Sequence, residues 1–159
     1  MTNAAERLAA LGLTLPPVTA PAAAYVPAVR TGSYIYVSGQ VSWGADGKVV
    51  GAGDMRAQCD QVFKNLTNVL RGAGAGWSDI IKMNSYMVNL NAENVAALRE
   101  TRAGYLKPGQ MPASTLVGVT SLVQPELLLE VEVLAAVDGA GAARATKPIA
   151  KAAKKKRRR

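Results

Sequence analysis

The side chains able to do chemistry in this chain are limited by what the sequence lacks. It contains no histidine and a single cysteine, Cys59. A Ser-His-Asp or Cys-His catalytic arrangement is therefore excluded, as are zinc ligation by Cys/His clusters and a disulfide within one chain. Acid–base chemistry must use Asp, Glu, Lys, Tyr or water, and no metal or other cofactor is expected. Cys59 lies on the apolar stripe of a predicted helix, which is typical of a packed core thiol.

Two carboxylates alternate near the end of the predicted domain. The apolar run 127–137 reads as a strand, and its two-residue period places Glu130 and Glu132 on the same face. If Glu130 is buried without a neighbouring cation, its carboxylate tends towards protonation. If it is exposed, it is an ordinary strand residue, and the residues alone leave both interpretations open.

The elements that would position these residues follow from hydrophobic periodicity. Residues 54–71 repeat apolar side chains at three- and four-residue spacing, which predicts a helix capped by Asp54. Asn91 caps a second predicted helix that runs to about Leu106. Strands are predicted at 25–30, 34–38, 48–50 (short), 80–90, 114–120 and 127–137. The main order is β-β-α-β-α-β-β, an α/β fold in the form of a two-layer sandwich.

One face of this sheet has nothing in the chain to cover it. Two helices can cover only one side, and the other side still carries apolar strand residues. We therefore expect that face to bury against another subunit.

The charge divides the chain into two parts. Residues 139–159 hold nine Lys/Arg and no acid, whereas residues 1–138 hold ten Lys/Arg against eleven Asp/Glu. The sequence predicts one domain over 1–138, in which 1–24 form a short helix and a proline-rich lead-in, and a basic, disordered tail over 139–159. The tail ends in Lys154, Lys155, Lys156, Arg157, Arg158 and Arg159. Nonspecific contact with nucleic acid and a merely solvated tail both stay open.

The order and spacing of several segments resemble the Rid family, also called YjgF-like or reactive-intermediate deaminase proteins. The resemblance covers residues 25–137. It rests on YIYVSGQ at 34–40, GKVV at 47–50, residues 58–73 of the long helix, DIIK at 79–82, Pro112-Ala113, and LEVEV at 129–133. It implies a chorismate-mutase-like fold and a homotrimer whose sheets form an inner barrel, with three ligand clefts between subunits.

The resemblance also assigns residues to the cleft. Tyr25 matches the family's cleft tyrosine, Ser38 and Gly39 match its Ser-Gly turn, and Glu130 matches the glutamate that positions the attacking water. Family members of known activity hydrolyse enamines and imines to 2-keto acids and ammonia. These matches make Glu130 the candidate catalytic residue.

One departure from the family pattern affects carboxylate binding. The family's Pro-Ala-Arg motif ends in Ser114 here, so the arginine that grips a substrate carboxylate is missing. Losing a bidentate charge-assisted pair weakens carboxylate binding by roughly one to two decades. Arg99, which aligns near the family's helix asparagine, and Arg102 are the candidate replacements, although both also fit as solvated helix charges.

Three functions are therefore open for the chain. The first is a trimer that binds a small imine, enamine or keto-acid-like metabolite without the usual deaminase activity. The second is an active deaminase that uses a different cation. The third is an RNA-associated protein, resembling family members described as ribonucleases or translation inhibitors, aided by the basic tail. No apolar run is long enough to span a membrane and no secretory signal is evident, so a cytoplasmic protein is expected.

Overall fold

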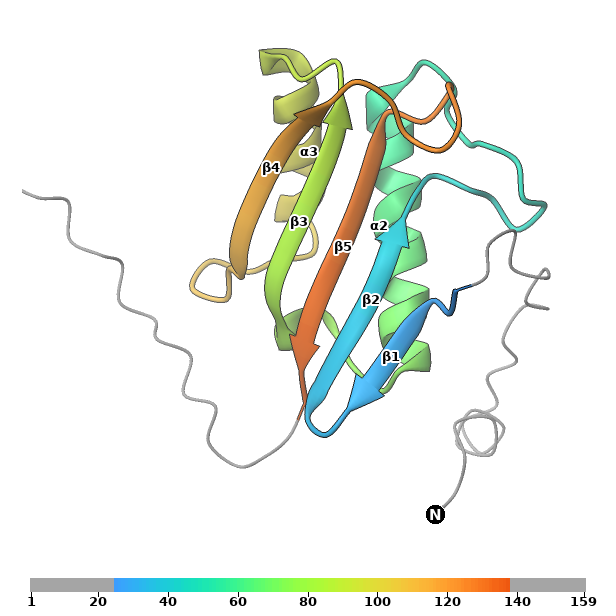
Figure 1. Cartoon of the computed structure of the whole chain (residues 1–159). Coiled ribbons are helices and arrows are strands. Elements are labelled where there is room, and N and C mark those ends of the chain that lie inside the picture. The colour runs from blue at the N-terminus through green and yellow to red at the C-terminus, as the bar shows by residue number, and fades with distance from the viewer. Residues whose placement is uncertain (1–24, 138–159) are drawn as a thin grey trace, which may run out of the picture.

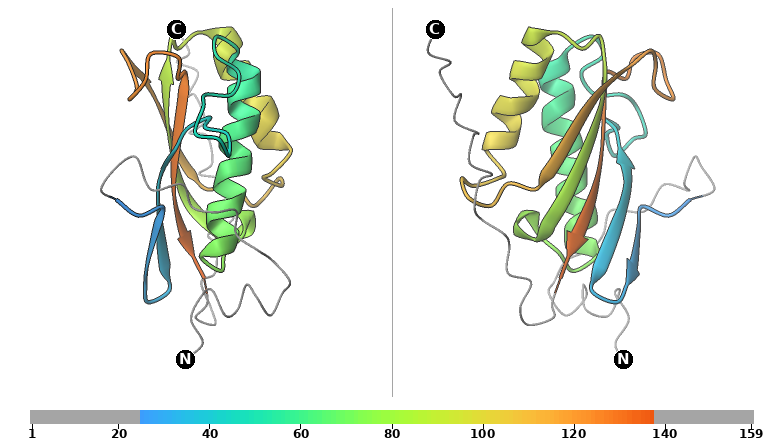
Figure 2. Two further views of the ribbon diagram at one scale, coloured as in Figure 1. Left: turned by 90° about the vertical axis from the view of Figure 1, so that its right-hand side faces the viewer. Right: turned by 60° about the vertical axis from the view of Figure 1, so that its left-hand side comes forward.

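The computed structural model describes residues 25–137, and the predicted N-terminal helix and basic tail lie outside them. A five-stranded sheet has the order β1-β2-β5-β3-β4, and helices α2 and α3 pack on one of its faces (Figures 1 and 2). All neighbouring strands are antiparallel except β3 and β4, which are parallel. The elements are β1 Ala28–Thr31, β2 Tyr34–Gln40, α2 Met55–Gly72, a 3-10 turn Trp77–Asp79, β3 Ile80–Val88, α3 Ala92–Ala103, β4 Ala113–Val119 and β5 Leu129–Ala136. The predicted fold class and element order are confirmed.

Both helices begin where the sequence predicts. The side chain of Asp54 accepts a hydrogen bond from the backbone N–H of Ala57 at 3.1 Å, and Asn91 accepts one from Asn94 at 2.9 Å. These side chains satisfy backbone donors that the first helical turn leaves unpaired. Helix α3 ends three residues earlier than predicted, because Gly104 caps it and the chain then turns back on Arg102.

The core lies between the helices and one face of the sheet. Strand β5 alternates strictly along its length: Leu129, Val131, Val133 and Ala135 are buried, whereas the residues that alternate with them are half-buried. The core side of α2 supplies Cys59, Phe63 and Leu66, none of which is exposed. Burial of this apolar surface is the main favourable contribution to the fold.

The predicted short strand at 48–50 is wrong. Only an isolated bridge joins Trp43 and Val49. The segment instead forms a turn in which the backbone N–H of Lys48 donates to the Asp46 carboxylate at 3.1 Å. Gly51 follows with a φ of 72°, a left-handed conformation that breaks the extended backbone.

The opposite face of the sheet has no helix over it within the described residues (Figure 2). Val29, Tyr34 and Tyr36 on β1 and β2 are each about half exposed, at 52%, 48% and 53%. Val117 on β4 is 43% exposed. We call this surface the open face. No described helix is long and apolar enough to cross a membrane.

Candidate functional site

The Ser38-Gly39 turn is a bulge in the sheet. Val37 pairs with Val133 and Gln40 pairs with Val131, so β2 has one more residue than β5 over this stretch. A bulge re-aims side chains and is common beside functional sites. Here it interrupts the hydrogen-bond ladder between β2 and β5, and β5 is the strand that carries Glu130.

Glu130 packs directly on Gly39. A Cβ atom built at Gly39 would overlap the Glu130 carboxylate, so a larger residue here would force this side chain to move. Glu130 is half-buried, and its side chain makes no hydrogen bond or ion pair within the described residues. Burial, and to a smaller extent the nearby charge of Glu132, raise the pKa of Glu130. The sequence matches that put Gly39 and Glu130 in one site thus correspond to a direct contact.

Ser38 fixes the segment that begins with Tyr25. Its hydroxyl donates to the carbonyl of Val26 at 2.7 Å, and its backbone N–H donates to the carbonyl of Pro27 at 3.0 Å. The Tyr25 side chain is 54% exposed and extends from this anchored segment. Ser38 therefore positions the chain beside Tyr25, and its hydroxyl oxygen keeps lone pairs to accept a further hydrogen bond.

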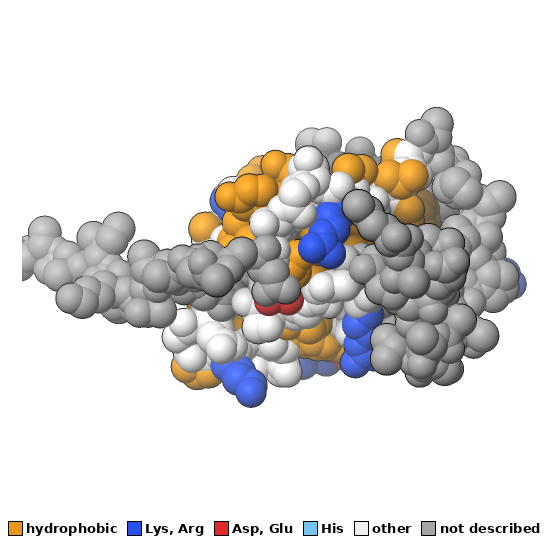
Figure 3. Space-filling view, turned by 90° about the horizontal axis from the view of Figure 1, so that it is seen from below, with side chains coloured by type: hydrophobic (Ala, Val, Ile, Leu, Met, Phe, Trp, Pro, Cys, Tyr) orange, Lys and Arg blue, Asp and Glu red, His pale blue; other side chains and the backbone are white. Residues whose placement is uncertain are grey.

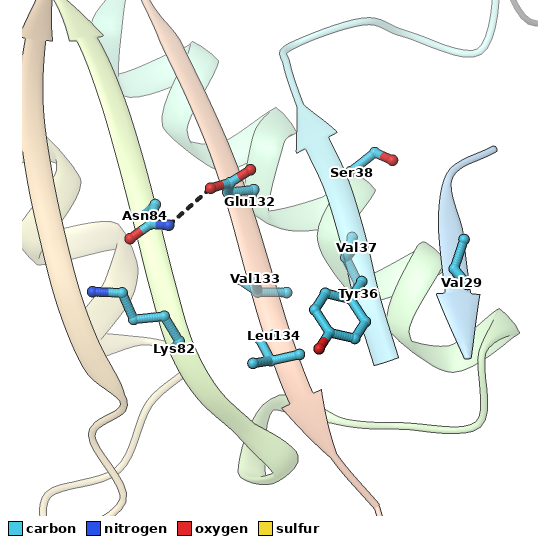
Figure 4. Close-up of a pocket in the computed structure, with 9 residues that line it drawn as sticks. All are labelled: Val29, Tyr36, Val37, Ser38, Lys82, Asn84, Glu132, Val133 and Leu134. Carbon is cyan, nitrogen blue, oxygen red and sulfur yellow. Dashed lines mark hydrogen bonds between the residues drawn. The ribbon is translucent and has the colours of Figure 1, made fainter. Parts of the chain in front are cut away.

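A hollow of about 430 Å³ lies on the open face between β1, β2, β5 and β3. Figure 4 shows Glu132 pointing towards Asn84 across the two central strands, with Lys82 further along β3. Glu132 accepts hydrogen bonds from the Asn84 amide at 2.8 Å and from the Tyr86 hydroxyl at 3.0 Å. The bond to Glu132 is the main reason that the pKa of Tyr86 is raised.

Sequence reasoning gave the side chains around Glu132 no role. Lys82, Asn84 and Tyr86 alternate along β3, and this two-residue polar period was the available signal. Asn84 and Tyr86 make the two carboxylates different. Within the described residues Glu132 accepts hydrogen bonds from both of these side chains, whereas the Glu130 carboxylate accepts none.

Ser114 lies on the opposite side of the sheet, facing the helices. It pairs with the buried residue Met83 in the parallel register, so both side chains point to the helix layer. Arg102 lies in the last turn of α3 and donates from Nη1 to the Ser114 hydroxyl at 3.4 Å. Arg99 is exposed, and its side chain makes no hydrogen bond or ion pair with any described residue. Of the two candidate cations, the structure brings only Arg102 to Ser114.

The predicted site residues therefore form two groups within one chain. The acid group consists of Ser38, Gly39 and Glu130, with Tyr25 next to it, and the cation group consists of Arg102 and Ser114. The groups lie on opposite faces of the sheet. They are also offset along β3, because Glu130 pairs with Tyr86 and Ser114 pairs with Met83. Among residues 25–137, no group of three or more His, Cys, Asp or Glu side chains could hold a metal ion.

Comparison with known proteins identifies relatives along most of the chain. The family model for endoribonuclease L-PSP matches residues 17–137. The mitochondrial protein MMF1 of Saccharomyces cerevisiae is 34% identical over 114 residues, which is 72% of this chain and 75% of that protein. A 2-iminobutanoate/2-iminopropanoate deaminase of Dermatophagoides farinae is 28% identical over 110 residues, 69% of this chain and 84% of that protein.

A solved structure agrees with both the sequence pattern and the fold. The Rid-family protein YyfB of Yersinia pestis is 38% identical and superposes with a TM-score of 0.61, covering 67% of this chain and 80% of that one. The function of that protein is unknown. The sheet order, the bulge beside Glu130 and these matches lead to one assignment: the chain belongs to the endoribonuclease L-PSP family, also known as the Rid or YjgF family.

Proposed function

We propose that copies of this chain assemble as a homotrimer and bind a small imine, enamine or 2-oxo acid in clefts between subunits. The observation that carries the proposal is the placement of Glu130 on Gly39. A half-buried carboxylate with no hydrogen-bond donor among the described residues has free oxygen atoms for a ligand or for water. Its raised pKa is typical of a functional carboxyl group rather than of a solvated one.

The open face supports assembly. It presents Val29, Tyr34, Tyr36 and Val117 at roughly half exposure, together with the polar group around Glu132. Exposed apolar side chains with polar ones between them are typical of protein interfaces. Analytical ultracentrifugation is expected to give a trimer, and a monomer at all concentrations would contradict the proposal.

A second candidate is hydrolysis of the bound imine, which the raised pKa of Glu130 favours. The carboxylate accepts a proton from water while the water oxygen bonds to the imine carbon. The carboxyl group returns this proton to the imine nitrogen, which gives a carbinolamine. The carboxylate then takes the hydroxyl proton of the carbinolamine and passes it to the same nitrogen, so that the remaining carbon–nitrogen single bond breaks and a carbonyl compound and ammonia leave. A carboxyl group whose pKa lies closer to neutral can both accept and return the proton. The name of the Dermatophagoides relative is consistent with this chemistry.

One pair of assays tests both candidates. Calorimetric titration with 2-oxobutanoate measures binding, and freshly generated 2-iminobutanoate measures hydrolysis against the buffer rate. Glu130→Ala is expected to weaken oxo-acid binding about tenfold, because the carboxylate accepts a hydrogen bond from a water molecule that in turn donates to the oxo oxygen. Glu126→Gln is the matched control, because this exposed acid uses only its backbone carbonyl in a hydrogen bond. Absence of any oxo-acid binding by the wild-type protein would refute the binding proposal, and a rate equal to buffer would refute hydrolysis.

An RNA-associated role is a third candidate, and its basis is the tail of nine Lys/Arg together with the name of the matching family. The salt dependence of RNA binding separates it from the others, because tail contacts neutralise phosphates and weaken steeply with salt. Removal of residues 139–159 is expected to abolish such binding. Binding that survives this truncation would show that the tail is not the determinant.

A further inference from the structure

The second half of helix α2 carries positive charge that no acid beside it in the sequence offsets. Between Asp60 and Asp79 the chain contains Lys64 and Arg71 but no acidic residue. Lys64, Asn68 and Arg71 are exposed, and their spacing of four and three residues places them on one face of the helix. This face therefore presents two cations and an amide to solvent.

The first half of the same helix differs, because α3 supplies partners for its charges. Arg56 is ion-paired with Glu100, and the Asp60 carboxylate accepts a hydrogen bond from the Thr101 hydroxyl at 3.2 Å. In the described part of the chain, no ion pair involves the second half of α2. The cations there keep their full charge for a partner from outside the domain.

Arg30 extends this positive surface past the end of α2. It pairs with the buried residue Ile35 across β1 and β2, so its side chain lies on the helix side of the sheet. Its Nη1 lies 3.7 Å from the position of a Cβ built on Gly74, in the turn that follows α2. The end of the molecule where α2 finishes shows Lys and Arg side chains at several places and acidic ones at one small spot (Figure 3). We call Arg30, Lys64 and Arg71 the basic stripe.

The chain leaves the described domain close to Arg30. The backbone N–H of Val137 donates to the carbonyl of Ser33 at 2.8 Å, in the turn between β1 and β2. Residues 139–159, with nine Lys/Arg and no acid, follow almost directly in the sequence. The sequence thus continues from this end of the domain with a second run of cations.

The composition of the stripe favours a nucleic-acid backbone over a membrane surface. A helix that lies on a membrane needs large apolar side chains on its buried face. None of the exposed large hydrophobic residues in the described part of the chain lies between positions 61 and 78. The helical rise separates Lys64 from Arg71 by about 10 Å, or roughly three phosphate spacings along one strand of a duplex. The guanidinium fork of arginine also matches the geometry of a phosphate group.

We propose that the basic stripe binds the phosphate backbone of an RNA strand that the cations of residues 139–159 also contact. The inference rests on the RNA-associated role proposed above and assigns part of it to the folded domain. It involves neither Glu130 nor the open face. Three phosphate contacts alone give a roughly millimolar Kd at about 0.1 M salt, so the stripe adds to binding by the tail and does not replace it.

Two matched double variants of the full-length protein test the stripe, with a labelled oligouridine as the probe and salt titrations followed by fluorescence anisotropy. Lys64→Gln/Arg71→Gln should make the slope of log K against log salt about 1.4 less negative and weaken binding about 25-fold at about 0.1 M salt. Lys48→Gln/Arg56→Gln also removes one exposed lysine and one exposed arginine, and it should bind within about twofold of wild type. Equal weakening by both variants would show an effect of net charge alone and overturn the inference.

Truncation of residues 139–159 separates this inference from the role of the tail. If truncation abolishes RNA binding while Lys64→Gln/Arg71→Gln binds like the wild type, the tail keeps its role and the stripe is refuted. If the double variant weakens binding and truncation does not, the stripe stands and the role of the tail is refuted. Absence of RNA binding by the wild type at low salt would refute both.

Anionic vesicles and melting curves complete the comparison. Loss of binding to phosphatidylserine vesicles in Lys64→Gln/Arg71→Gln, with RNA binding unchanged, would assign the stripe to a membrane and overturn the inference. Both double variants should melt within a few degrees of the wild type, since glutamine is a good helix former. If either does not, Lys64→Gln and Arg71→Gln are measured singly, and each should change the slope by about 0.7.

Discussion

The two faces of strand β5 differ although their residues alternate along the same strand. Leu129, Val131 and Val133 point to the helices and are buried in an apolar core. Glu130 and Glu132 point to the open face, where one packs on a glycine and the other accepts two hydrogen bonds. The first set explains why the chain folds. The second set lies outside the apolar core, and in the function proposed above this face serves binding and assembly.

The largest expected effect contrasts the two faces directly. Val131→Asp places a charge in the apolar core and should destabilise the chain by about 4 kcal/mol or more, enough to unfold it. Leu134→Asp makes the same kind of change on the open face, beside the hollow. It should leave far-UV circular dichroism unchanged while shifting sedimentation towards smaller species. Unfolding by both variants would remove the distinction between the faces.

A second prediction concerns the contact that joins β2 to β5. Gly39→Ala overlaps the Glu130 carboxylate and should cost about 0.5–1.5 kcal/mol in the free energy of unfolding, because the glutamate side chain must leave its present rotamer; urea denaturation measures this cost. Gly72→Ala is the matched control, because a Cβ there meets nothing and the residue is helical. The control should be neutral or stabilising by up to about 1 kcal/mol.

The double variant Gly39→Ala/Glu130→Ala completes this test. Removal of the carboxylate frees the space that the new methyl group needs, so most of the lost stability should return. If the double variant is as unstable as Gly39→Ala alone, the cost comes from the backbone of the bulge rather than from Glu130.

Much of the fold could be predicted because its signals are local. Asp54 and Asn91 cap helices at the positions where short polar side chains precede apolar periodicity. The alternation in 129–136 likewise predicted that Glu130 and Glu132 share a face, and the structure confirms it. The prediction of a strand at 48–50 is wrong because composition alone does not distinguish a strand from a turn that precedes a glycine in the left-handed conformation.

The arrangement of the candidate site could be predicted only in part. The family resemblance indicated Gly39 and Glu130 together, but the contact between them depends on a bulge whose register no local pattern specifies. The same limit applies to Ser114. Its face is set by parallel pairing with β3, a contact between segments about thirty residues apart in sequence. The sequence named both Arg99 and Arg102, and only the placement of α3 against β4 distinguishes them.

The smallest expected effect separates the two carboxylates by pH. Because the pKa of Glu130 is raised in the folded protein, the folded state holds more protons than the unfolded state above the ordinary carboxyl value of about 4.3. The contribution of Glu130 to the free energy of unfolding therefore falls as the pH rises from the ordinary carboxyl pKa to the raised one, and it stays reduced at higher pH. Glu130→Gln should be slightly more stable than wild type at pH 7.5 and equal to it below about pH 4. The gain is a fraction of a kcal/mol, since solvent screens a half-exposed group.

Glu132→Gln is the matched control for this measurement. It replaces the carboxylate that accepts from Asn84 and Tyr86, so the loss of charge-assisted bonds should lower stability at pH 7.5. The two substitutions are chemically identical, and they lie on the same face two residues apart. Thermal melts compare both variants with the wild type at pH 7.5 and below pH 4. At pH 7.5 the melting temperature should rise for Glu130→Gln and fall for Glu132→Gln. A destabilised Glu130→Gln at neutral pH would mean that its carboxylate is stabilised in the folded protein, which would contradict the unpaired acid proposed for the site.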